Sequence, residues 1–328
     1  MTLCVEIMSM SDFRDRGTLK WISYKAMEFV VRKYLSRVRP LRGDTPIRPF
    51  FIVGSGRSGN TLLRRILNSN ESVFIPPETY VLGELIKKYI KTPFLAWDKT
   101  VELVYSHLQN QPEFYTFNIQ DMSKLIDNAL GWQSNERNLS QLINEFYLYY
   151  RDQNGSTGNR WGDKTPINTF YLEEIMATFP DSQVIHMLRD PYDVVYSYLN
   201  ANLYHDCTAA AQRWCDSMHA VEAFRQDYPG NLFEIAYEDL VTKPKSIVEE
   251  VCNFLSIDYD DKMLSYNART GPLGDADVYS HHENVKKTII ADRIGRGKQG
   301  LSSHDLEAIS AVINANGIHQ NHYHILNL

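Results

Sequence analysis

The stretch FFIVGSGRSGNTLL, residues 50–63, decides the fold of this chain. An apolar, β-prone run ends at a glycine-rich turn, and apolar residues at helical spacing begin straight after the turn. A strand, a glycine loop and a helix in this order form a phosphate cradle, because the loop N–H groups and the positive end of the helix dipole face the same anion. The sequence therefore predicts a phosphate-binding loop over residues 54–61.

One position in this loop indicates which ligand it binds. The spacing from Gly54 to Gly59 matches the ATP-binding loop, but Asn60 stands where that loop has its lysine. Because the lysine normally contacts the β- and γ-phosphates, Asn60 argues against a nucleoside triphosphate. Arg57 offers another cation within the loop. We expect a phosphate-bearing ligand other than ATP or GTP, with a P-loop kinase or NTPase as the alternative enzyme class.

The composition sets wider bounds on the protein. A chain of 328 residues with 43% hydrophobic and 23% charged residues is typical of a globular protein, and the net charge of −6 gives no general reason to bind nucleic acid. The four cysteines lack the spacing of a metal site, so we expect free thiols in a reducing compartment. No signal peptide and no apolar run long enough to span a membrane are visible, which favours a cytoplasmic location.

Residues 19–42 have a pattern of their own. Apolar and basic side chains alternate there in the manner of a basic amphipathic helix. Such a helix can lie on an anionic membrane surface, which would make the protein peripheral at the membrane. It can equally pack on the protein with its basic face in water. We expect residues 1–45 to form this N-terminal region and residues 46–328 to form the main domain.

Strand-like and helix-like patterns alternate along the rest of the chain. Strand-like runs occur at residues 73–75, 183–188 and 232–235, and helical patterns lie between them. This alternation predicts an α/β fold with three layers and a central, mainly parallel sheet. The helical patterns before residue 180 lie over residues 82–90, 101–108, 122–130, 139–150 and 168–179.

Polar groups follow three of the predicted strands. They occupy residues 54–61, 189–197 and 237–239. Because ligands of parallel sheets bind at the carboxyl ends of the strands, we expect these segments to converge. Arg189 suits a phosphate, since its planar guanidinium donates two parallel hydrogen bonds. The alternative is an ion pair between Arg189 and a neighbouring aspartate.

Three motifs together resemble the sulfotransferases that use 3′-phosphoadenosine 5′-phosphosulfate (PAPS): GSGRSGNTLL at residues 54–63, LRDPYDVVYS at residues 188–197 and YEDL at residues 237–240. The resemblance implies that the first motif holds the 5′-phosphosulfate, that the second holds the 3′-phosphate, and that the third lies beside the nucleotide. Residues 294–301 resemble the family's C-terminal nucleotide-binding loop. The implied PAPS-binding residues are Arg57, Ser58, Gly59, Asn60, Thr61, Arg189, Ser197, Tyr237, Arg296 and Lys298.

Two further segments, PET at residues 77–79 and DKTP at residues 163–166, resemble the tyrosylprotein and carbohydrate branch of this family. That resemblance implies Glu78 as the general base and Lys164 as the cation that assists the sulfuryl group. Each residue has a simpler explanation: Glu78 could be an exposed carboxylate at the start of a helix, and Lys164 a surface lysine. His205 is the alternative base.

The expected chemistry agrees with these residues. Sulfuryl transfer is an in-line displacement at sulfur, so the acceptor hydroxyl must give its proton to a base such as a carboxylate. Negative charge builds on the leaving nucleotide, which requires fixed donors such as Arg57, Lys164 and the loop amides. No metal is needed in principle. We predict transfer from PAPS to a hydroxyl of a carbohydrate, lipid, small metabolite or tyrosyl peptide, with a non-catalytic nucleotide-binding protein as a further alternative.

Overall fold

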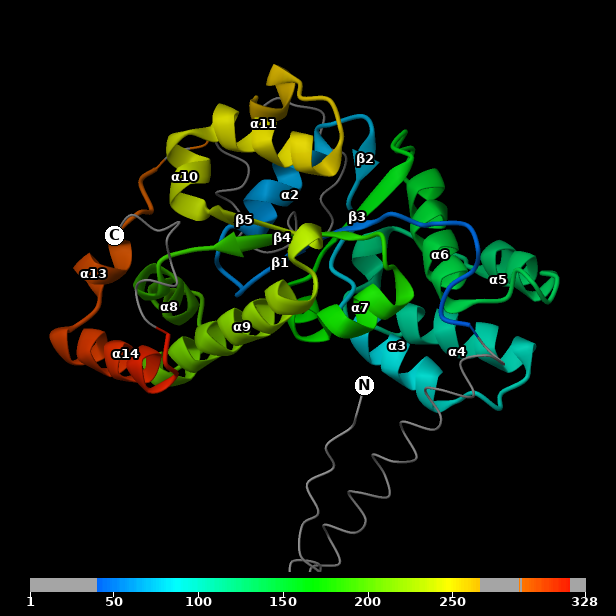
Figure 1. Ribbon diagram of the computed structural model, residues 1–328, viewed down its shortest axis with the longest axis horizontal. Coiled ribbons are helices and arrows are strands. Elements are labelled where there is room, and N and C mark those ends of the chain that lie inside the picture. Colours follow the sequence, from blue (N-terminus) through cyan, green and yellow to red (C-terminus); the bar gives the residue numbers. More distant parts are fainter. Residues whose placement is uncertain (1–39, 266–288, 290, 319–328) are drawn as a thin grey trace, which may run out of the picture.

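A five-stranded parallel sheet forms the centre of the fold in the computed structural model, which describes residues 40–265, 289 and 291–318 (Figure 1). Most of the expected N-terminal region, residues 1–39, lies outside the described residues. The strands follow the order β2-β3-β1-β4-β5 across the sheet. They are β1 (Phe50–Val53), β2 (Val73–Phe74), β3 (Arg160–Lys164), β4 (Gln183–Leu188) and β5 (Leu232–Ala236).

The predicted α/β fold with a central parallel sheet is confirmed, and the structure adds one strand to the prediction. Strand β3 pairs with β1, with Ile52 opposite Lys164. The sequence did not indicate this strand because Gly162, Asp163 and Lys164 break the apolar pattern of a buried strand. These two charged side chains are nevertheless almost fully buried, at 1% and 0% exposure. Their burial at the end of a strand is a sign of a polar site.

The side chains of β1 contribute to the core on both faces of the sheet, since successive side chains of a strand point in opposite directions. Phe50 and Ile52 belong to the core formed with α2 (Asn60–Asn68), α10 (Tyr237–Thr242) and α11 (Pro244–Leu255), while Phe51 and Val53 belong to the core on the opposite face. Figure 1 shows α2, α10 and α11 above the sheet and α8 (Pro191–Asn200) and α9 (Cys207–Asp227) below it. All four strand residues are fully buried.

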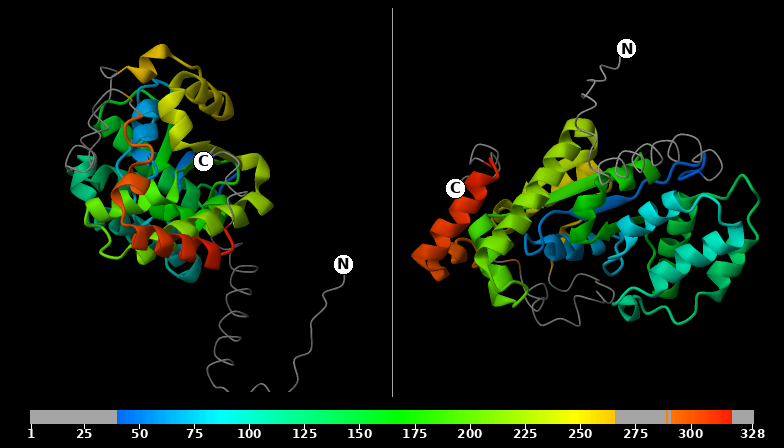
Figure 2. Two further views of the ribbon diagram at one scale, coloured as in Figure 1. Left: turned by 90° about the vertical axis from the view of Figure 1, so that its left-hand side faces the viewer. Right: turned by 90° about the horizontal axis from the view of Figure 1, so that it is seen from below.

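The helices complete the layers. Helices α3 to α6 form a group at one end of the molecule, and α14 lies against α9 at the other end (Figure 2). The long helices are α2 (Asn60–Asn68), α3 (Leu82–Lys91), α4 (Trp97–Gln109), α5 (Ser123–Leu130), α6 (Leu139–Gln153), α8 (Pro191–Asn200), α9 (Cys207–Asp227), α11 (Pro244–Leu255) and α14 (Ser303–Ala315). The shorter ones are η3 (Phe114–Phe117), η4 (Pro166–Tyr171), α7 (Leu172–Thr178), η5 (Pro229–Asn231), α10 (Tyr237–Thr242), η6 (Asp261–Leu264) and α13 (Arg296–Gly300).

The helix predicted over residues 168–179 is in fact two elements. A 3-10 helix, η4, begins at Pro166 and gives way to α7 at Leu172. Proline at the first position of η4 suits a helix start because no partner is needed there for its missing N–H. No helix of the described part of the chain is long and apolar enough to cross a membrane.

One partly buried polar network joins the sheet to α9. His186 on β4 lies opposite Glu234 on β5, and its Nδ1 is 2.8 Å from the Glu234 carboxylate. The other carboxylate oxygen accepts a hydrogen bond from Arg225 Nε at 3.0 Å. Burial alone would raise the pKa of Glu234, but these two partners lower it to about 2. The network therefore stabilises the fold most when Glu234 is ionised.

Glu234→Gln tests this network. A carboxylate with a lowered pKa in the folded state contributes stability above its unfolded pKa of about 4.5, and this contribution is lost as the pH falls towards 2. We expect the variant to lose on the order of 2 kcal/mol of unfolding free energy at pH 7. Urea titrations at pH 7 and pH 3 should show a smaller difference at the lower pH, and an equal difference at both would contradict the assignment.

Candidate functional site

Each strand delivers a different functional group to one edge of the sheet. Since all five strands are parallel, their carboxyl ends meet at this edge. Lys164 is the last residue of β3, the glycine loop follows β1, Arg189 follows β4, and Tyr237 follows β5. Glu78 comes four residues after β2, at the outer side of β3. The strand order therefore puts Glu78 and Lys164 on one side of the loop and Arg189 and Tyr237 on the other.

The glycine loop has the backbone that its sequence predicts. Gly54 and Gly59 adopt φ values of 128° and 97°, which favour glycine, and Arg57 has a φ of 70°. A Cβ on Gly59 would lie 2.6 Å from the ring of Tyr237, so this position also requires close approach. Helix α2 begins at Asn60, directly after Gly59. The helix N-terminus and the preceding loop thus form the expected phosphate cradle.

Neighbouring residues brace the loop. The N–H of Gly54 donates to Thr169 Oγ1 on η4 at 2.9 Å. The buried side chain of Asn60 donates to the carbonyl of Ser55 at 3.0 Å. Asn60 therefore supports the loop backbone in the place where ATP-binding loops have their lysine. Thr61, the next residue predicted to bind PAPS, is half-buried in the first turn of α2.

Tyr198 on α8 packs against the same loop. Its hydroxyl lies 3.3 Å from Ser55 Oγ. A Cβ on Gly56 would lie 2.6 Å from that hydroxyl oxygen and 3.4 Å from the ring carbon that carries it. The contact explains why position 56 is occupied by glycine, although its φ is not in the left-handed region.

Arginine side chains gather beside the loop. Burial lowers the pKa of Arg57, and the positive charges of Arg189 and Arg293 lower it further, while Tyr198 and Glu78 act in the opposite direction. Like charges that act on one another across a partly buried site favour binding of an anion. Arg57 Nε also donates to Ser197 Oγ at 3.1 Å, which brings together two of the predicted PAPS-binding residues.

Arg189 is the most constrained of these arginines. Its guanidinium donates to the carbonyl of Arg57 at 3.0 Å and to the carbonyl of Arg293 at 2.9 Å. It lies 3.6 Å from the Asp193 carboxylate and 4.3 Å from the ring centre of Tyr237. Arg189 therefore forms the ion pair with a neighbouring aspartate that was the alternative explanation, and it also lies at the strand end beside the glycine loop. The residue is 6% exposed, and these contacts hold its guanidinium in place before any ligand binds.

Two buried donors at the loop are placed to bind an anion. Among the described residues, neither Ser58 Oγ nor Arg189 Nε has a hydrogen-bond partner. Ser58 belongs to the loop and Arg189 lies beside it. Unpaired buried donors are costly, and an anionic ligand with several acceptor oxygens would satisfy both. This arrangement fits a nucleotide that carries phosphate groups at two positions.

Glu78 and Lys164 form a buried ion pair on the other side of the loop. The lysine is fully buried, and the glutamate is 9% exposed. Lys164 is therefore not a surface lysine, and Glu78 is not the exposed helix-end carboxylate of the simpler explanation. The charge of Glu78 acts on Arg57, which indicates that the pair lies close to the loop. His205, the alternative base, is exposed in the turn between α8 and α9.

Asp163 holds the segment that carries Glu78, a role that the sequence did not reveal. Its buried carboxylate accepts hydrogen bonds from Tyr147 at 2.6 Å, from Asn168 at 2.8 Å and from the Thr79 hydroxyl. The N–H of Thr79 also donates to Thr165 Oγ1 at 2.9 Å. Burial raises the pKa of Asp163, and these donors oppose the shift. The network fixes Glu78 relative to Lys164, the neighbour of Asp163.

The C-terminal segment, residues 291–301, carries Arg293 as well as the predicted Arg296 and Lys298. Arg296 is exposed and donates to Asp292 at 2.6 Å, and Lys298 lies 3.9 Å from Asp190 at the N-terminus of α8. Arg293 carries a charge that acts on Arg57 and Tyr237. It lies one residue before the segment 294–301 that the sequence singled out, so it was not among the predicted site residues.

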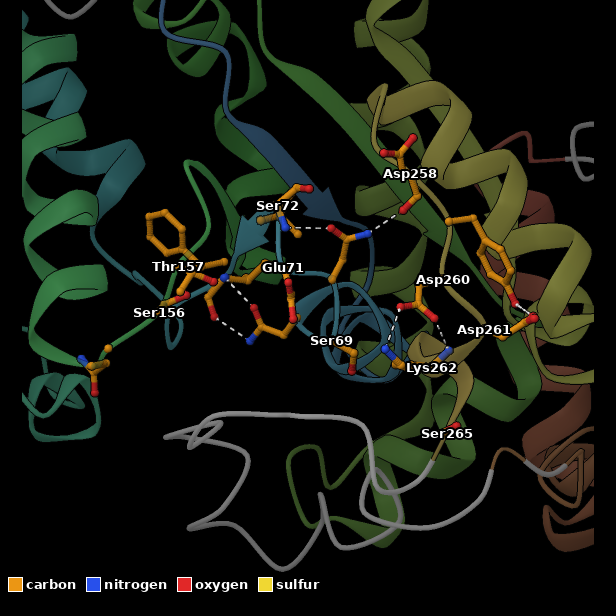
Figure 3. Close-up of a pocket in the computed structure, with 18 of the residues that line it drawn as sticks. Ser69, Glu71, Ser72, Ser156, Thr157, Asp258, Asp260, Asp261, Lys262 and Ser265 are labelled. Atoms are coloured by element: carbon orange, nitrogen blue, oxygen red, sulfur yellow. Dashed lines mark hydrogen bonds and ion pairs between the residues drawn. The ribbon is translucent and has the colours of Figure 1, made fainter.

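A separate pocket lies at the opposite edge of the sheet, with a volume of about 1250 Å³ (Figure 3). It is lined by residues 68–75, by residues before β3, by α11 and by residues 258–265, and none of the residues of the glycine loop belongs to it. Its polar side chains are largely bonded to one another: Asn70 donates to the carbonyl of Asp258, and Lys262 lies 3.7 Å from Asp260. Within the described ranges, no cluster of three or more His, Cys, Asp or Glu side chains could hold a metal ion.

Comparisons with known proteins show the family to which this fold belongs. The model of the sulfotransferase family matches residues 49–261. An uncharacterized protein of Aquifex aeolicus (strain VF5) is 26% identical over 291 residues, which cover 85% of this chain and 34% of that protein. Protein-tyrosine sulfotransferase A of Caenorhabditis elegans is 25% identical over 272 residues, which cover 79% of this chain and 64% of the relative. The chain thus spans about a third and about two thirds of the lengths of these relatives.

Solved structures share the fold. The sulfotransferase domain of the Synechococcus PCC 7002 olefin synthase superposes with a TM-score of 0.55 at 23% identity, covering 82% of this chain and 96% of that domain. The sulfotransferase domain from the curacin biosynthetic pathway gives a TM-score of 0.56 at 22% identity, covering 84% of this chain and 99% of that domain. The shared fold therefore covers nearly all of each of these two sulfotransferase domains and more than four fifths of this chain.

Gly56→Ala tests how the loop is supported. The added Cβ would clash with the Tyr198 hydroxyl, so we expect nucleotide affinity to fall by about tenfold and the unfolding temperature to drop by a few degrees. Tyr198→Phe removes the clashing oxygen, and the double variant should recover most of both losses. Equal defects in the single and double variants, measured by calorimetry and thermal unfolding, would show that Tyr198 does not set the loop position.

Proposed function

This chain belongs to the sulfotransferase family, and we propose that it transfers the sulfuryl group of PAPS to a hydroxyl acceptor. The observation that carries the proposal is the arginine cluster around a glycine loop, together with the two unpaired buried donors Ser58 Oγ and Arg189 Nε. The cluster fits a ligand with separate phosphate groups better than one with a single phosphate, because its donors follow different strands of the sheet.

The donor nucleotide would bind along the inner part of the sheet edge. The loop amides, Ser58 and Arg57 would hold the 5′-phosphosulfate, and Arg189 and Ser197 would hold the 3′-phosphate. Arg293 would add a cation on the same side, and Arg296 and Lys298 remain the further basic residues that the sequence suggested for the nucleotide. Tyr237 packs on both Gly59 and Arg189, so it would lie beside the bound nucleotide.

The acceptor would react on the other side of the loop. Its hydroxyl oxygen attacks sulfur, the bond between sulfur and the bridging phosphate oxygen breaks, and 3′-phosphoadenosine 5′-phosphate (PAP) leaves. Glu78 would take the hydroxyl proton. Lys164 and Arg57 would stabilise the charge that develops on the sulfuryl and bridging oxygens. The buried ion pair supports these roles, because it keeps the base and the cation together at the edge of the loop.

The alternative of a P-loop kinase is weakened by Asn60. Its amide is committed to the carbonyl of Ser55 and offers no positive charge to a γ-phosphate. A non-catalytic nucleotide-binding protein would not need a buried carboxylate–lysine pair beside the loop, since burying two charges is costly. Both observations favour sulfuryl transfer.

The proposed acceptors are hydroxyl groups of carbohydrates, lipids or small metabolites, with tyrosyl peptides as a further class. A direct test is the release of PAP from PAPS in the presence of a sugar, a long-chain alcohol, a simple phenol and a tyrosyl peptide. The peptide is included because one relative is named as a protein-tyrosine sulfotransferase. Release of PAP that depends on one acceptor class would support the proposal and identify the substrate.

Arg189→Ala tests the donor site. We expect the affinity for PAPS and for PAP to fall by at least tenfold each, because both carry the 3′-phosphate that Arg189 would bind. Arg151→Ala, which removes an arginine paired with Asp152 at the surface, is the matched control and should change neither affinity. Unchanged PAP binding by the Arg189 variant, measured by calorimetry, would remove Arg189 from the site.

Glu78→Gln tests the base. PAP affinity should stay within about twofold, while turnover with the identified acceptor should fall by about 10²-fold or more. Glu102→Gln is the control, since Glu102 also pairs with a lysine, Lys99, but at the surface. A near-normal rate for the Glu78 variant would assign proton transfer to another group, such as His205.

A further inference from the structure

We propose that Asp193 positions the segment that carries Arg293, and that it thereby determines how strongly the enzyme recognises the 3′-phosphate. The inference rests on the proposed function, and it assigns to Asp193 a positioning role rather than contact with the nucleotide. The side chain is fully buried in the first turn of α8.

The Asp193 carboxylate is bonded mainly to the backbone of the C-terminal segment. One oxygen accepts the N–H of Gly295 at 2.9 Å, and the other accepts the N–H of Gly297 at 2.6 Å. A carboxylate that accepts two backbone N–H bonds in a buried place is a strong attachment. Two hydrogen bonds from residues two apart fix the position of the chain as well as its distance from α8.

Glycine allows the segment to lie directly on α8. A Cβ on Gly297 would lie 2.3 Å from the carbonyl group of Tyr192, and a Cβ on Gly300 would lie 2.4 Å from the ring of Tyr196. Gly295 has a φ of 75°, which turns the chain towards α8 between its bonds to Asp193. The seat therefore consists of the Asp193 carboxylate and these glycine contacts.

The seated segment delivers Arg293 to the arginine cluster. Arg293 lies two residues before Gly295, and its carbonyl accepts a hydrogen bond from Arg189 at 2.9 Å. Its charge acts on both Arg57 and Tyr237. If the seat is lost, the bond between Arg189 and the Arg293 carbonyl is no longer supported, and the Arg293 charge is no longer held near the arginine cluster.

The negative charge of Asp193, taken alone, predicts a change in PAP affinity opposite to the one expected from its positioning role. Asp193 lies 3.6 Å from Arg189, so its negative charge opposes an anion at this site. Removing that charge should tighten the binding of PAP if charge is all that matters. Asp193→Asn should instead weaken it, because an amide NH₂ would face one of the two N–H donors and leave it unpaired.

The experiment compares the affinities for PAP and 5′-AMP, which differ in the 3′-phosphate. For Asp193→Asn we expect the Kd of PAP to rise by about ten- to a hundred-fold, and the Kd of 5′-AMP to change by less than about twofold. Gly297→Ala keeps the charge of Asp193 but forces the segment off α8, and it should cause the same loss. Asp261→Asn removes an equal charge at an exposed ion pair with Lys245, away from the loop, and it should leave the ratio of the two Kd values unchanged.

The outcomes separate this inference from the proposed function. A wild-type protein that binds PAP no better than 5′-AMP would overturn both. A wild-type protein that prefers PAP, with Asp193→Asn and Gly297→Ala keeping that preference, would overturn the inference alone. If Asp193→Asn proves too unstable to titrate, Gly297→Ala decides the question. Arg293→Ala combined with Gly297→Ala should lose little more than either single variant, since both remove the same contribution.

Discussion

The buried guanidinium of Arg189 is the contact on which the site depends. It joins the glycine loop through the carbonyl of Arg57, the C-terminal segment through the carbonyl of Arg293, α8 through Asp193, and α10 through the ring of Tyr237. Four segments that are distant in sequence therefore share one cation. Because its Nε lacks a partner among the described residues, the same side chain still has a donor for a ligand. The site is thus organised in advance, and this lowers the cost of ordering it upon binding.

The strand order explains how one edge of the sheet can hold a nucleotide-binding region and an acceptor-binding region on opposite sides of the loop. The loop after β1 lies between the ends of β3 and β4, so one flank offers the Glu78–Lys164 pair and the other offers arginines. In the proposed reaction the nucleotide would occupy the arginine flank and the acceptor the carboxylate flank, with the sulfuryl group between them over the loop. Asp163 on one flank and Asp193 on the other both use buried carboxylates to hold neighbouring segments in place.

The sequence was informative where backbone geometry demands particular residues, and less so where burial is decided by distant contacts. Glycines, apolar runs and Arg189 were sufficient to predict the loop, the parallel sheet and the converging strand ends. Strand β3 could not be predicted from its pattern, because Asp163 and Lys164 are buried by partners such as Tyr147 and Glu78 that come from other elements. The contact between Arg189 and the Arg293 carbonyl was hidden for a similar reason, since it depends on how the C-terminal segment lies on α8.

The most direct test of the account is a calorimetric titration of the wild-type protein with PAP, 5′-AMP and ATP with Mg²⁺. We expect PAP to bind at least tenfold more tightly than 5′-AMP and without any metal, because the arginine flank offers donors for a second phosphate group. Preference for ATP with Mg²⁺, or equal affinity for PAP and 5′-AMP, would contradict the assignment of the loop and the arginines to PAPS.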